Sequence, residues 1–338
     1  MKLLITGASG FAGNVLLDLL TRNPLEAKIS VFMLPDDPGE ARIRSKEIRD
    51  LRIIYGDITD TEAVDEAVTG HNHVVHLAGL ISYWGRERER LFRVNHLGVE
   101  NIVDACLRHE VQRLVHVSSV GAIGIKRDGS LADEDTEFNW PRSFPYMTSK
   151  YAGQQVVERA VRERNLQAII LNPASIMGPG DPIASTPHNQ LYDRIYNQTL
   201  FGCFGGGLAI TDVRDLAEIV VKALTMGKVG ERYLVVGANV AYKKVVKAIG
   251  GYFQRKVFPF RVPAFLLTAA GAVMEMVSWI TGKKPLLTRA YGRLSGWFGY
   301  YANRKSREAF GHEYLPFERT IADGCRYFEE QYGKKWEG

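Results

Sequence analysis

Short apolar runs and amphipathic stretches alternate along the first half of the chain. A short apolar run predicts a buried strand, and apolar residues three or four apart predict a helix that packs on a core. The runs that predict strands are residues 3–5, 28–34, 51–55, 73–77, 113–117 and 167–171. Helical spacing covers residues 11–20, 62–68, 87–109 and 146–165. Such alternation is typical of a doubly wound α/β fold, in which helices cover both faces of a parallel sheet.

The regular alternation stops after Pro173, where glycines and prolines interrupt the pattern. Residues 212–224 then predict an amphipathic helix and residues 231–236 a further strand, whereas the pattern beyond Tyr242 is mostly helical. We therefore expect two parts in the chain. They are a first domain of residues 1–175, to which residues 208–237 return, and a smaller, mostly helical C-terminal lobe of residues 176–207 and 238–338.

Three glycines mark the first turn from strand to helix. Gly7, Gly10 and Gly13 follow the first apolar run at the spacing G-x-x-G-x-x-G. The absence of a Cβ at these positions makes room for the turn itself, for a pyrophosphate that lies on the backbone, and for the packing of helix on strand. The N-terminus of the helix also offers N–H groups to the phosphate. A flexible glycine-rich turn is the alternative. The flanking strand and helix favour a dinucleotide site, with the loop residues Gly7, Ser9, Gly10, Phe11, Ala12 and Gly13.

Composition narrows the classes of function. Lys and Arg number 43 against 38 Asp and Glu, and the net charge of +5 is spread along the chain, so nucleic-acid binding is not predicted. Cys106, Cys203 and Cys325 are far apart and have no companion His cluster, so we predict no metal site and a reducing compartment. Because the first strand begins at the N-terminus, without room for a leader, we expect a cytoplasmic protein.

Residues 262–282 are apolar enough to raise the question of a membrane. Glu275 lies inside this stretch, and Pro263, Gly271 and Gly282 interrupt or bound it, which argues against a spanning helix. We expect a helix that packs on the C-terminal lobe or lines an apolar substrate pocket. Peripheral contact with a membrane surface, or a lipid-like substrate, is the alternative.

Tyr146 and Lys150 are four residues apart at the start of a predicted helix, so they lie on one face of it, one turn apart. A nearby ammonium favours the phenolate and lowers the pKa of a tyrosine, and such a pair can pass a proton to or from a carbinol oxygen. A chance pair on a helix is the alternative. Ser119 sharpens the prediction, because it follows the fifth strand and its hydroxyl can hold the same oxygen.

Together these motifs form an ordered set that covers most of the chain. The set is Gly7-x-x-Gly10-x-x-Gly13, Asp57 after the third strand, His76-Leu77-Ala78-Gly79 after the fourth, Ser119, and Tyr146-x-x-x-Lys150. It resembles the extended short-chain dehydrogenase/reductase family, the NAD-dependent epimerases and dehydratases. Residues 118–124 and 283–288 are most similar to the branch of dihydroflavonol 4-reductases, 3β-hydroxysteroid dehydrogenases and hopanoid-associated sugar epimerases.

The resemblance implies a Rossmann domain at residues 1–175, a substrate-binding C-terminal lobe, and a role for each motif residue. Tyr146 would be the acid and base, Lys150 would lower its pKa and hold the nicotinamide ribose, and Ser119 would hold the substrate oxygen. Asn95 matches a family position that either supports the cofactor site or contacts the cofactor. The remaining cofactor contacts would be Asp57 and Ile58 at the adenine, Leu77, Ala78 and Gly79 at the adenosine, and Pro173 and Ser175 at the nicotinamide. A homodimer through helices 87–109 and 146–165 is also implied.

The cofactor is NAD or NADP, and the end of the second strand bears on the choice. An NAD enzyme offers an Asp or Glu there for the ribose hydroxyls, and an NADP enzyme an Arg for the phosphate. Residues 32–35 contain neither. Asp36 and Asp37 come late for NAD, whereas Arg42, Arg44 and Lys46 follow in the next loop, so the sequence favours NADP slightly. Ordinary solvated charges are the alternative.

Three classes of function agree with these residues. The first is an oxidoreductase that acts on a ketone or secondary alcohol. A bulky hydrophobic substrate is suggested by aromatic residues of the C-terminal lobe, although packing within the lobe is the alternative; they are Phe258, Phe260, Phe265, Trp279, Trp297 and Phe298. The second is a nucleotide-sugar epimerase; a dehydratase is disfavoured because Val120 and Gly121 follow Ser119 where that class carries Asp-Glu. The third is a cofactor-binding sensor without activity, which would typically lack Tyr146 or Lys150.

Overall fold

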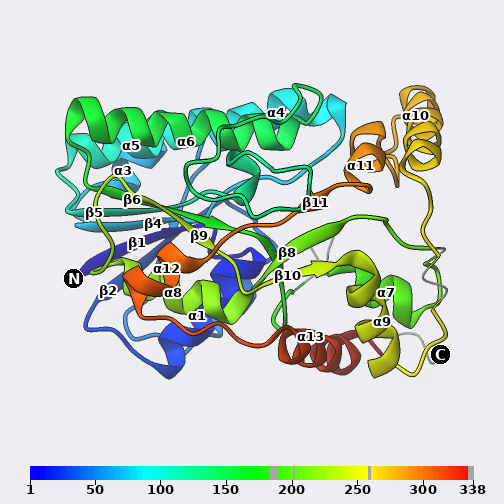
Figure 1. Cartoon of the computed structure of the whole chain (residues 1–338). Helices are drawn as coiled ribbons and strands as arrows, with labels where there is room; N and C mark the ends of the chain where they lie inside the picture. Colours follow the sequence, from blue (N-terminus) through cyan, green and yellow to red (C-terminus); the bar gives the residue numbers. More distant parts are fainter. Residues whose placement is uncertain (183–188, 201, 258–259, 334–338) are drawn as a thin grey trace.

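Seven parallel strands form the central sheet of the protein (Figure 1). The computed structural model describes residues 1–182, 189–200, 202–257 and 260–333. The strand order is β3-β2-β1-β4-β5-β6-β9, which confirms the predicted doubly wound Rossmann fold. The strands are β1 (Lys2–Thr6), β2 (Lys28–Met33), β3 (Arg52–Tyr55), β4 (His73–His76), β5 (Arg113–Val117), β6 (Ala168–Pro173) and β9 (Arg232–Val235).

Helices cover both faces of this sheet because its strands are apolar on both sides. Within β1, Leu3 and Ile5 belong to the core on one face and Leu4 to the core on the other. Figure 1 shows the two helical layers on opposite sides of the sheet. One layer contains α1 (Phe11–Arg22), α8 (Val213–Ala223) and α12 (Arg304–Phe310), and the other α3 (Thr61–Val68), α5 (Gly98–Arg108) and α6 (Pro145–Arg164).

The helix predicted over residues 87–109 is interrupted by one wide turn. The structure has η1 (Gly85–Glu87), α4 (Arg88–Phe92), a π-helical turn η2 (Arg93–Leu97) and then α5. The backbone carbonyl of Asn95, inside the π turn, lies against Gly153 of α6, where a Cβ would stand only 2.1 Å from that oxygen. Gly153 therefore gives the wide turn its room, and the π turn places the Asn95 side chain against the end of β4.

The C-terminal lobe contains a second sheet that the sequence analysis did not predict. The order is β10-β8-β11, with β7 also paired to β8. Its strands are β7 (Ser175–Met177), β8 (Gly207–Asp212), β10 (Ala238–Ala241) and β11 (Phe298–Gly299). The helices of this lobe are α7 (Gln190–Tyr196), α9 (Tyr242–Tyr252), α10 (Ala264–Thr281), α11 (Arg289–Leu294) and α13 (Phe317–Tyr332), and the short helices α2 (Glu40–Arg44) and η3 (Val120–Ala122) belong to the first domain. Because β7 directly follows β6, the second sheet begins beside the carboxyl ends of the central strands.

Candidate active site

The glycine loop between β1 and α1 is packed too closely for side chains at two of its three glycines. Gly7 has a φ of +72°, and a Cβ there would stand 2.6 Å from the backbone nitrogen of Ala78. A Cβ at Gly13 would stand 2.3 Å from the carbonyl oxygen of Gly7. The loop, the first turn of α1 and the end of β4 therefore lie in direct backbone contact.

The N-terminus of α1 is suited to a phosphate group. Its cap residue, Gly10, has no side chain to satisfy the first N–H groups, and the first turn of the helix carries no acidic residue. A Cβ at Gly10 would meet nothing closer than the Gly7 carbonyl oxygen at 3.4 Å, so the space over this residue is open. Free N–H groups, a positive helix end and an open backbone surface fit the diphosphate of a dinucleotide.

Alanine substitutions at Gly10 and Gly13 are expected to separate folding from cofactor binding. Gly10→Ala should leave the melting temperature of the ligand-free protein within about 2 °C of wild type, because the new methyl group meets only ordinary contacts. It should weaken cofactor binding at least about tenfold, because the methyl group occupies the phosphate surface. Gly13→Ala should lower both the melting temperature and the affinity for the cofactor. Thermal unfolding and calorimetric titration with each cofactor measure the two effects.

Gly251→Ala is the matched control, since a Cβ at Gly251 meets nothing within 4 Å. Unchanged cofactor affinity in Gly10→Ala would contradict the placement of the diphosphate over this loop.

The predicted adenosine contacts line the same edge of the sheet. Leu77, Ala78 and Gly79 directly follow β4, and the Ala78 N–H donates to the Thr6 hydroxyl at 3.2 Å. Asp57 and Ile58 follow β3. Asp57 accepts hydrogen bonds from the backbone and hydroxyl of Thr59 at 2.8 and 2.9 Å, and Ile58 is buried.

The charged residues after β2 divide into two groups. Arg44 pairs with Glu40 and Tyr55, and Lys46 pairs with Asp18, so both cations are engaged away from the glycine loop. Asp37 and Arg42 instead lie at Ser9. Asp37 accepts from the Ser9 hydroxyl at 2.8 Å and from the Gly39 N–H at 2.7 Å, and Arg42 donates to the Ser9 carbonyl at 3.0 Å. The buried Nε of Arg42 has no hydrogen-bond partner among the described residues.

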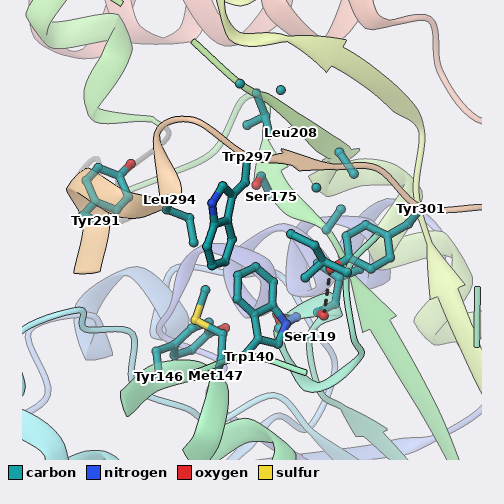
Figure 2. A pocket seen from close by; sticks show the side chains of 18 of the residues that line it. Ser119, Trp140, Tyr146, Met147, Ser175, Leu208, Tyr291, Leu294, Trp297 and Tyr301 are labelled. Carbon is teal, nitrogen blue, oxygen red and sulfur yellow. Dashed lines mark hydrogen bonds between the residues drawn. The ribbon is translucent and has the colours of Figure 1, made fainter. Parts of the chain in front are cut away.

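Ser119 and Tyr146 are brought together in a buried cleft at the end of β5 (Figure 2). Ser119 caps η3, and its Oγ accepts from the Gly121 N–H at 3.0 Å. Tyr146 stands on the first turn of α6, where Pro145 occupies the helix start. Burial raises the pKa of the Tyr146 phenol, and a hydrogen bond with the Ser119 side chain acts in the opposite direction. The phenol is therefore protonated at neutral pH and held beside the serine hydroxyl.

Lys150 lies one turn further along α6 and is also buried. Its Nζ donates to the carbonyl oxygen of Val117 at 3.3 Å, and burial lowers its pKa to about 8. We expected Lys150 to lower the pKa of Tyr146, but the group that opposes the rise caused by burial is Ser119. The lysine ammonium is instead held at the end of β5 and beside Gly79, where a Cβ would stand 3.3 Å from Nζ.

Asn95 supports this arrangement from the π turn. Its side chain accepts from the Leu80 N–H at 2.8 Å and donates to the Leu80 carbonyl at 2.9 Å and to the Ser149 hydroxyl at 3.0 Å. It thus ties the segment after β4 to the helix that carries Tyr146 and Lys150. These bonds agree with the supporting role, one of the two interpretations of the sequence.

Two buried histidines lie beneath Lys150, and the sequence analysis gave neither an active-site role. The rings of His76 and His116, at the ends of β4 and β5, stack with centroids 5.4 Å apart. Burial, followed by the charge of Lys150, lowers the pKa of His76 to about 3, and burial lowers that of His116 as well. Both imidazoles are therefore neutral at pH 7 and do not compete with the lysine charge. Their position at strand ends was the only sequence signal.

An apolar cavity of about 180 Å³ opens over Ser119 and Tyr146. Pro173 and Ser175 also line it. Figure 2 shows the rings of Trp140 and Trp297 side by side in this cavity, and their centroids are 5.8 Å apart. The aromatic residues that line the cavity are Tyr83, Trp140, Tyr146, Phe204, Tyr242, Tyr291, Trp297 and Tyr301.

Most of the aromatic residues that suggested a bulky substrate lie elsewhere. Of that set, Trp297 lines the cavity, whereas Phe260, Phe265 and Trp279 are exposed. Phe298 is half-buried and does not line the cavity, and Phe258 lies outside the described residues. Of the aromatic residues named from the sequence, only Trp297 is therefore among the described residues that line the cavity. Helical periodicity cannot show which aromatic side chains meet across loops. Tyr83 and Trp140, which the sequence analysis missed, come from segments without periodicity.

Comparisons with known proteins agree with this geometry. The model of the NAD-dependent epimerase/dehydratase family matches residues 3–237. A putative dihydroflavonol 4-reductase of Synechocystis sp. is 28% identical over 332 residues, which cover 96% of this chain and 94% of that protein. Sterol demethylase protein B of Methylococcus capsulatus is 25% identical over 344 residues, covering 98% and 99%. The solved structure of gox2253 is 27% identical and superposes with a TM-score of 0.82 over 98% of both chains.

Proposed function

The chain belongs to the NAD-dependent epimerase/dehydratase family, and from this premise we propose that it is an oxidoreductase that interconverts an apolar ketone and its secondary alcohol. The observation that carries the proposal is the position of Tyr146 beside Ser119, with Lys150 one turn behind, at the inner end of a cavity lined by aromatic side chains. A carbonyl oxygen placed between the two hydroxyls would be at hydrogen-bond distance from a proton donor.

The described side chains supply the proton chemistry and the placement. In reduction, the Tyr146 hydroxyl donates its proton to the substrate oxygen, and Ser119 holds that oxygen in line with the phenol. In oxidation the proton returns to Tyr146. Lys150, whose Nζ lies at the end of β5 and beside Gly79, would hold the ribose of the nicotinamide and so position the cofactor beside Tyr146. A bound nicotinamide cofactor would supply the hydride acceptor or donor, and Gly7, Gly10, Gly13, Gly79 and Lys150 are the residues that fit it.

The lining of the cavity supports an apolar substrate. No Lys, Arg, Asp or Glu lines it within the part of the chain that the structure describes. The nucleoside diphosphate of a sugar nucleotide needs cationic or strongly polar partners, and residues of the C-terminal lobe that offer such groups, among them Asn189, Asn197 and Arg293, do not line this cavity. The two full-length relatives are named for a dihydroflavonol and a sterol, which are both polycyclic compounds. We therefore place a reductase or dehydrogenase ahead of an epimerase.

We further propose NADP as the cofactor that binds more tightly. Asp37 already accepts two hydrogen bonds within the loop, whereas Arg42 keeps a buried Nε without a partner among the described residues. An unpartnered guanidinium nitrogen at the glycine loop is a donor for a ribose phosphate. Arg42→Gln is therefore expected to weaken NADP binding and leave NAD binding nearly unchanged.

Ligand-induced stabilisation tests the proposed function. A ligand at about 100 times its Kd stabilises the native state by about 2.7 kcal/mol, so thermal unfolding reports binding directly. NADP should raise the melting temperature more than NAD does at equal concentration. With cofactor saturating, steroid and aryl ketones should raise it further, and nucleotide sugars should not. A further rise with nucleotide sugars alone would favour the epimerase instead.

A further inference from the structure

Helix α10 presents a long apolar face that nothing in the described chain covers. Phe265, Met276, Trp279 and Ile280 are 71%, 67%, 69% and 84% exposed, and Val273 and Val277 lie exposed between them. By length and composition this helix could cross a membrane, and only 11% of it is buried. An exposed apolar patch of this kind marks an interaction surface. Figure 1 shows α10 standing at one end of the molecule, away from the central sheet.

The helix packs closely against α11 in this exposed position. Gly271 of α10 and Gly292 of α11 let the two helices cross closely: a Cβ on Gly271 would lie 2.5 Å from the backbone of Thr288, and one on Gly292 would lie 2.6 Å from that of Leu267. Arg86 adds a hydrogen bond of 3.2 Å to the Trp279 carbonyl. The exposed face is thus the outer side of a fixed α10–α11 hairpin.

Positive charge lies at the C-terminal end of this face, where Arg86, Lys283 and Lys284 are found, Lys284 being paired with Glu87 at 3.0 Å. Between residues 255 and 293 the sequence carries seven Lys and Arg and one acidic residue. The acidic residue, Glu275, is turned toward α11, where its carboxylate accepts from the Arg289 N–H at 3.1 Å. Lys283 and Lys284 follow the helix directly, and the guanidinium of Arg86 lies 4.5 Å from the Trp279 ring centroid. An apolar face with a basic border and an aromatic residue at its end is the chemistry of a protein that sits in the interface of an anionic bilayer.

A second cavity lies between helix α10 and the candidate active site. It has a volume of about 640 Å³ and is lined on one side by Leu267 and Met274 of α10 and by Leu286, and Arg194 and Lys284 also line it. Its inner wall is shared with the active-site cavity, because five residues line both: Ile81, Tyr83, Phe204, Tyr242 and Tyr291. The side chains of these five residues therefore separate the second cavity, beside α10, from the active-site cavity over Tyr146.

We propose that the outer face of the α10–α11 hairpin docks in the surface of an anionic lipid bilayer, with the second cavity as the route by which an apolar substrate passes from the lipid to Tyr146. The route rests on the proposed function, whereas the membrane contact does not. A second copy of the chain is a poorer occupant, because the basic borders of two such faces would repel each other. A bilayer with anionic headgroups complements both the apolar face and its border.

Vesicle flotation with the full-length protein tests the contact without any substrate. The probes are vesicles of phosphatidylcholine alone and of phosphatidylcholine with phosphatidylglycerol. Wild type should float with the anionic vesicles, at least about tenfold more tightly than with the neutral ones, and added salt should weaken the binding. The double variant Met276→Glu, Ile280→Glu should stay at the bottom of the gradient. Because both positions are exposed, its melting temperature should match that of wild type.

Met226→Glu is the matched control, since Met226 is an exposed methionine just after α8, far from α10. It should float as wild type does. The proposal is overturned if wild type fails to float with anionic vesicles, or if the double variant floats equally well. It is also overturned if sedimentation shows a wild-type dimer that the double variant breaks while neither binds vesicles. None of these results depends on turnover, so the proposed chemistry would stand or fall separately.

Discussion

Replacing Tyr146 by Phe is expected to lower turnover about a thousandfold or more and to change the cofactor Kd by no more than about threefold. The substitution removes one oxygen and keeps the ring, so the aromatic wall of the cavity and the contact with Tyr83 remain. The hydroxyl is the proton donor that we propose, and in the described part of the chain no carboxylate, lysine or histidine lines this cavity to replace it. Steady-state kinetics on the ketone found by ligand screening, with calorimetric titration of cofactor, measure the two effects.

Tyr83→Phe is the control for this variant. Tyr83 lines the same cavity, and its ring lies 5.9 Å from that of Tyr146, but it has no place in the proton transfer. Removal of the Tyr83 hydroxyl should lower turnover by less than about tenfold. If Tyr146→Phe retained turnover within tenfold of wild type, Tyr146 would not be the acid.

Replacing Lys150 by Met is expected to reduce turnover at least about a hundredfold and, at the same time, to make the ligand-free protein more stable at pH 7. Burial lowers the pKa of Lys150 from 10.5 to about 8, so the folded state holds the charged lysine at a cost. Such a shift corresponds to a cost of about 3 kcal/mol, which the methionine removes. The variant also loses the hydrogen bond to Val117, which lowers its stability by about 1 kcal/mol. The expected gain in the free energy of unfolding is thus about 2 kcal/mol.

The sign of the pH dependence follows from the same shift. The folded-state pKa lies below the unfolded one, so between about pH 8 and 10.5 the unfolded chain binds more protons and the stability of wild type rises with pH. The stability gap between Lys150→Met and wild type should therefore be full at pH 7 and shrink as the pH approaches 10.5. Urea unfolding at several pH values measures it. Lys247→Met, at an exposed position on α9, should show no such trend, and a constant gap in Lys150→Met would contradict the burial of a charged lysine.

Local patterns in the sequence were enough to predict the parts of the site that lie on regular elements. The glycine loop, the six first-domain strands and the Tyr146-x-x-x-Lys150 pair each depend on spacing within one element, and the structure has these elements within a few residues of the expected places. The π turn at Asn95 depends on Gly153, which is far away in the sequence, so helical periodicity could not show it. The second sheet was missed because its strands are short and pair across long connections.

The aromatic wall of the cavity was missed for a related reason. Trp140 comes from the loop before α6 and Trp297 from the segment after α11, and only the folded chain brings them together. The exposed face of helix α10 could not be predicted from local patterns either. The sequence left open whether residues 262–282 pack on the lobe or meet a membrane, and helical periodicity could not show which side chains of this helix α11 leaves exposed.

The central claim is that Tyr146, Ser119 and Lys150 serve hydride transfer to a ketone. The most direct measurement is the fate of deuterium when wild type is incubated with reduced cofactor, labelled at the reactive nicotinamide carbon, and an apolar ketone that stabilises the protein. The account predicts deuterium at the carbinol carbon of the product, and none when Tyr146→Phe replaces wild type. Cofactor binding by wild type without any transfer of label to the ketones that bind would contradict it.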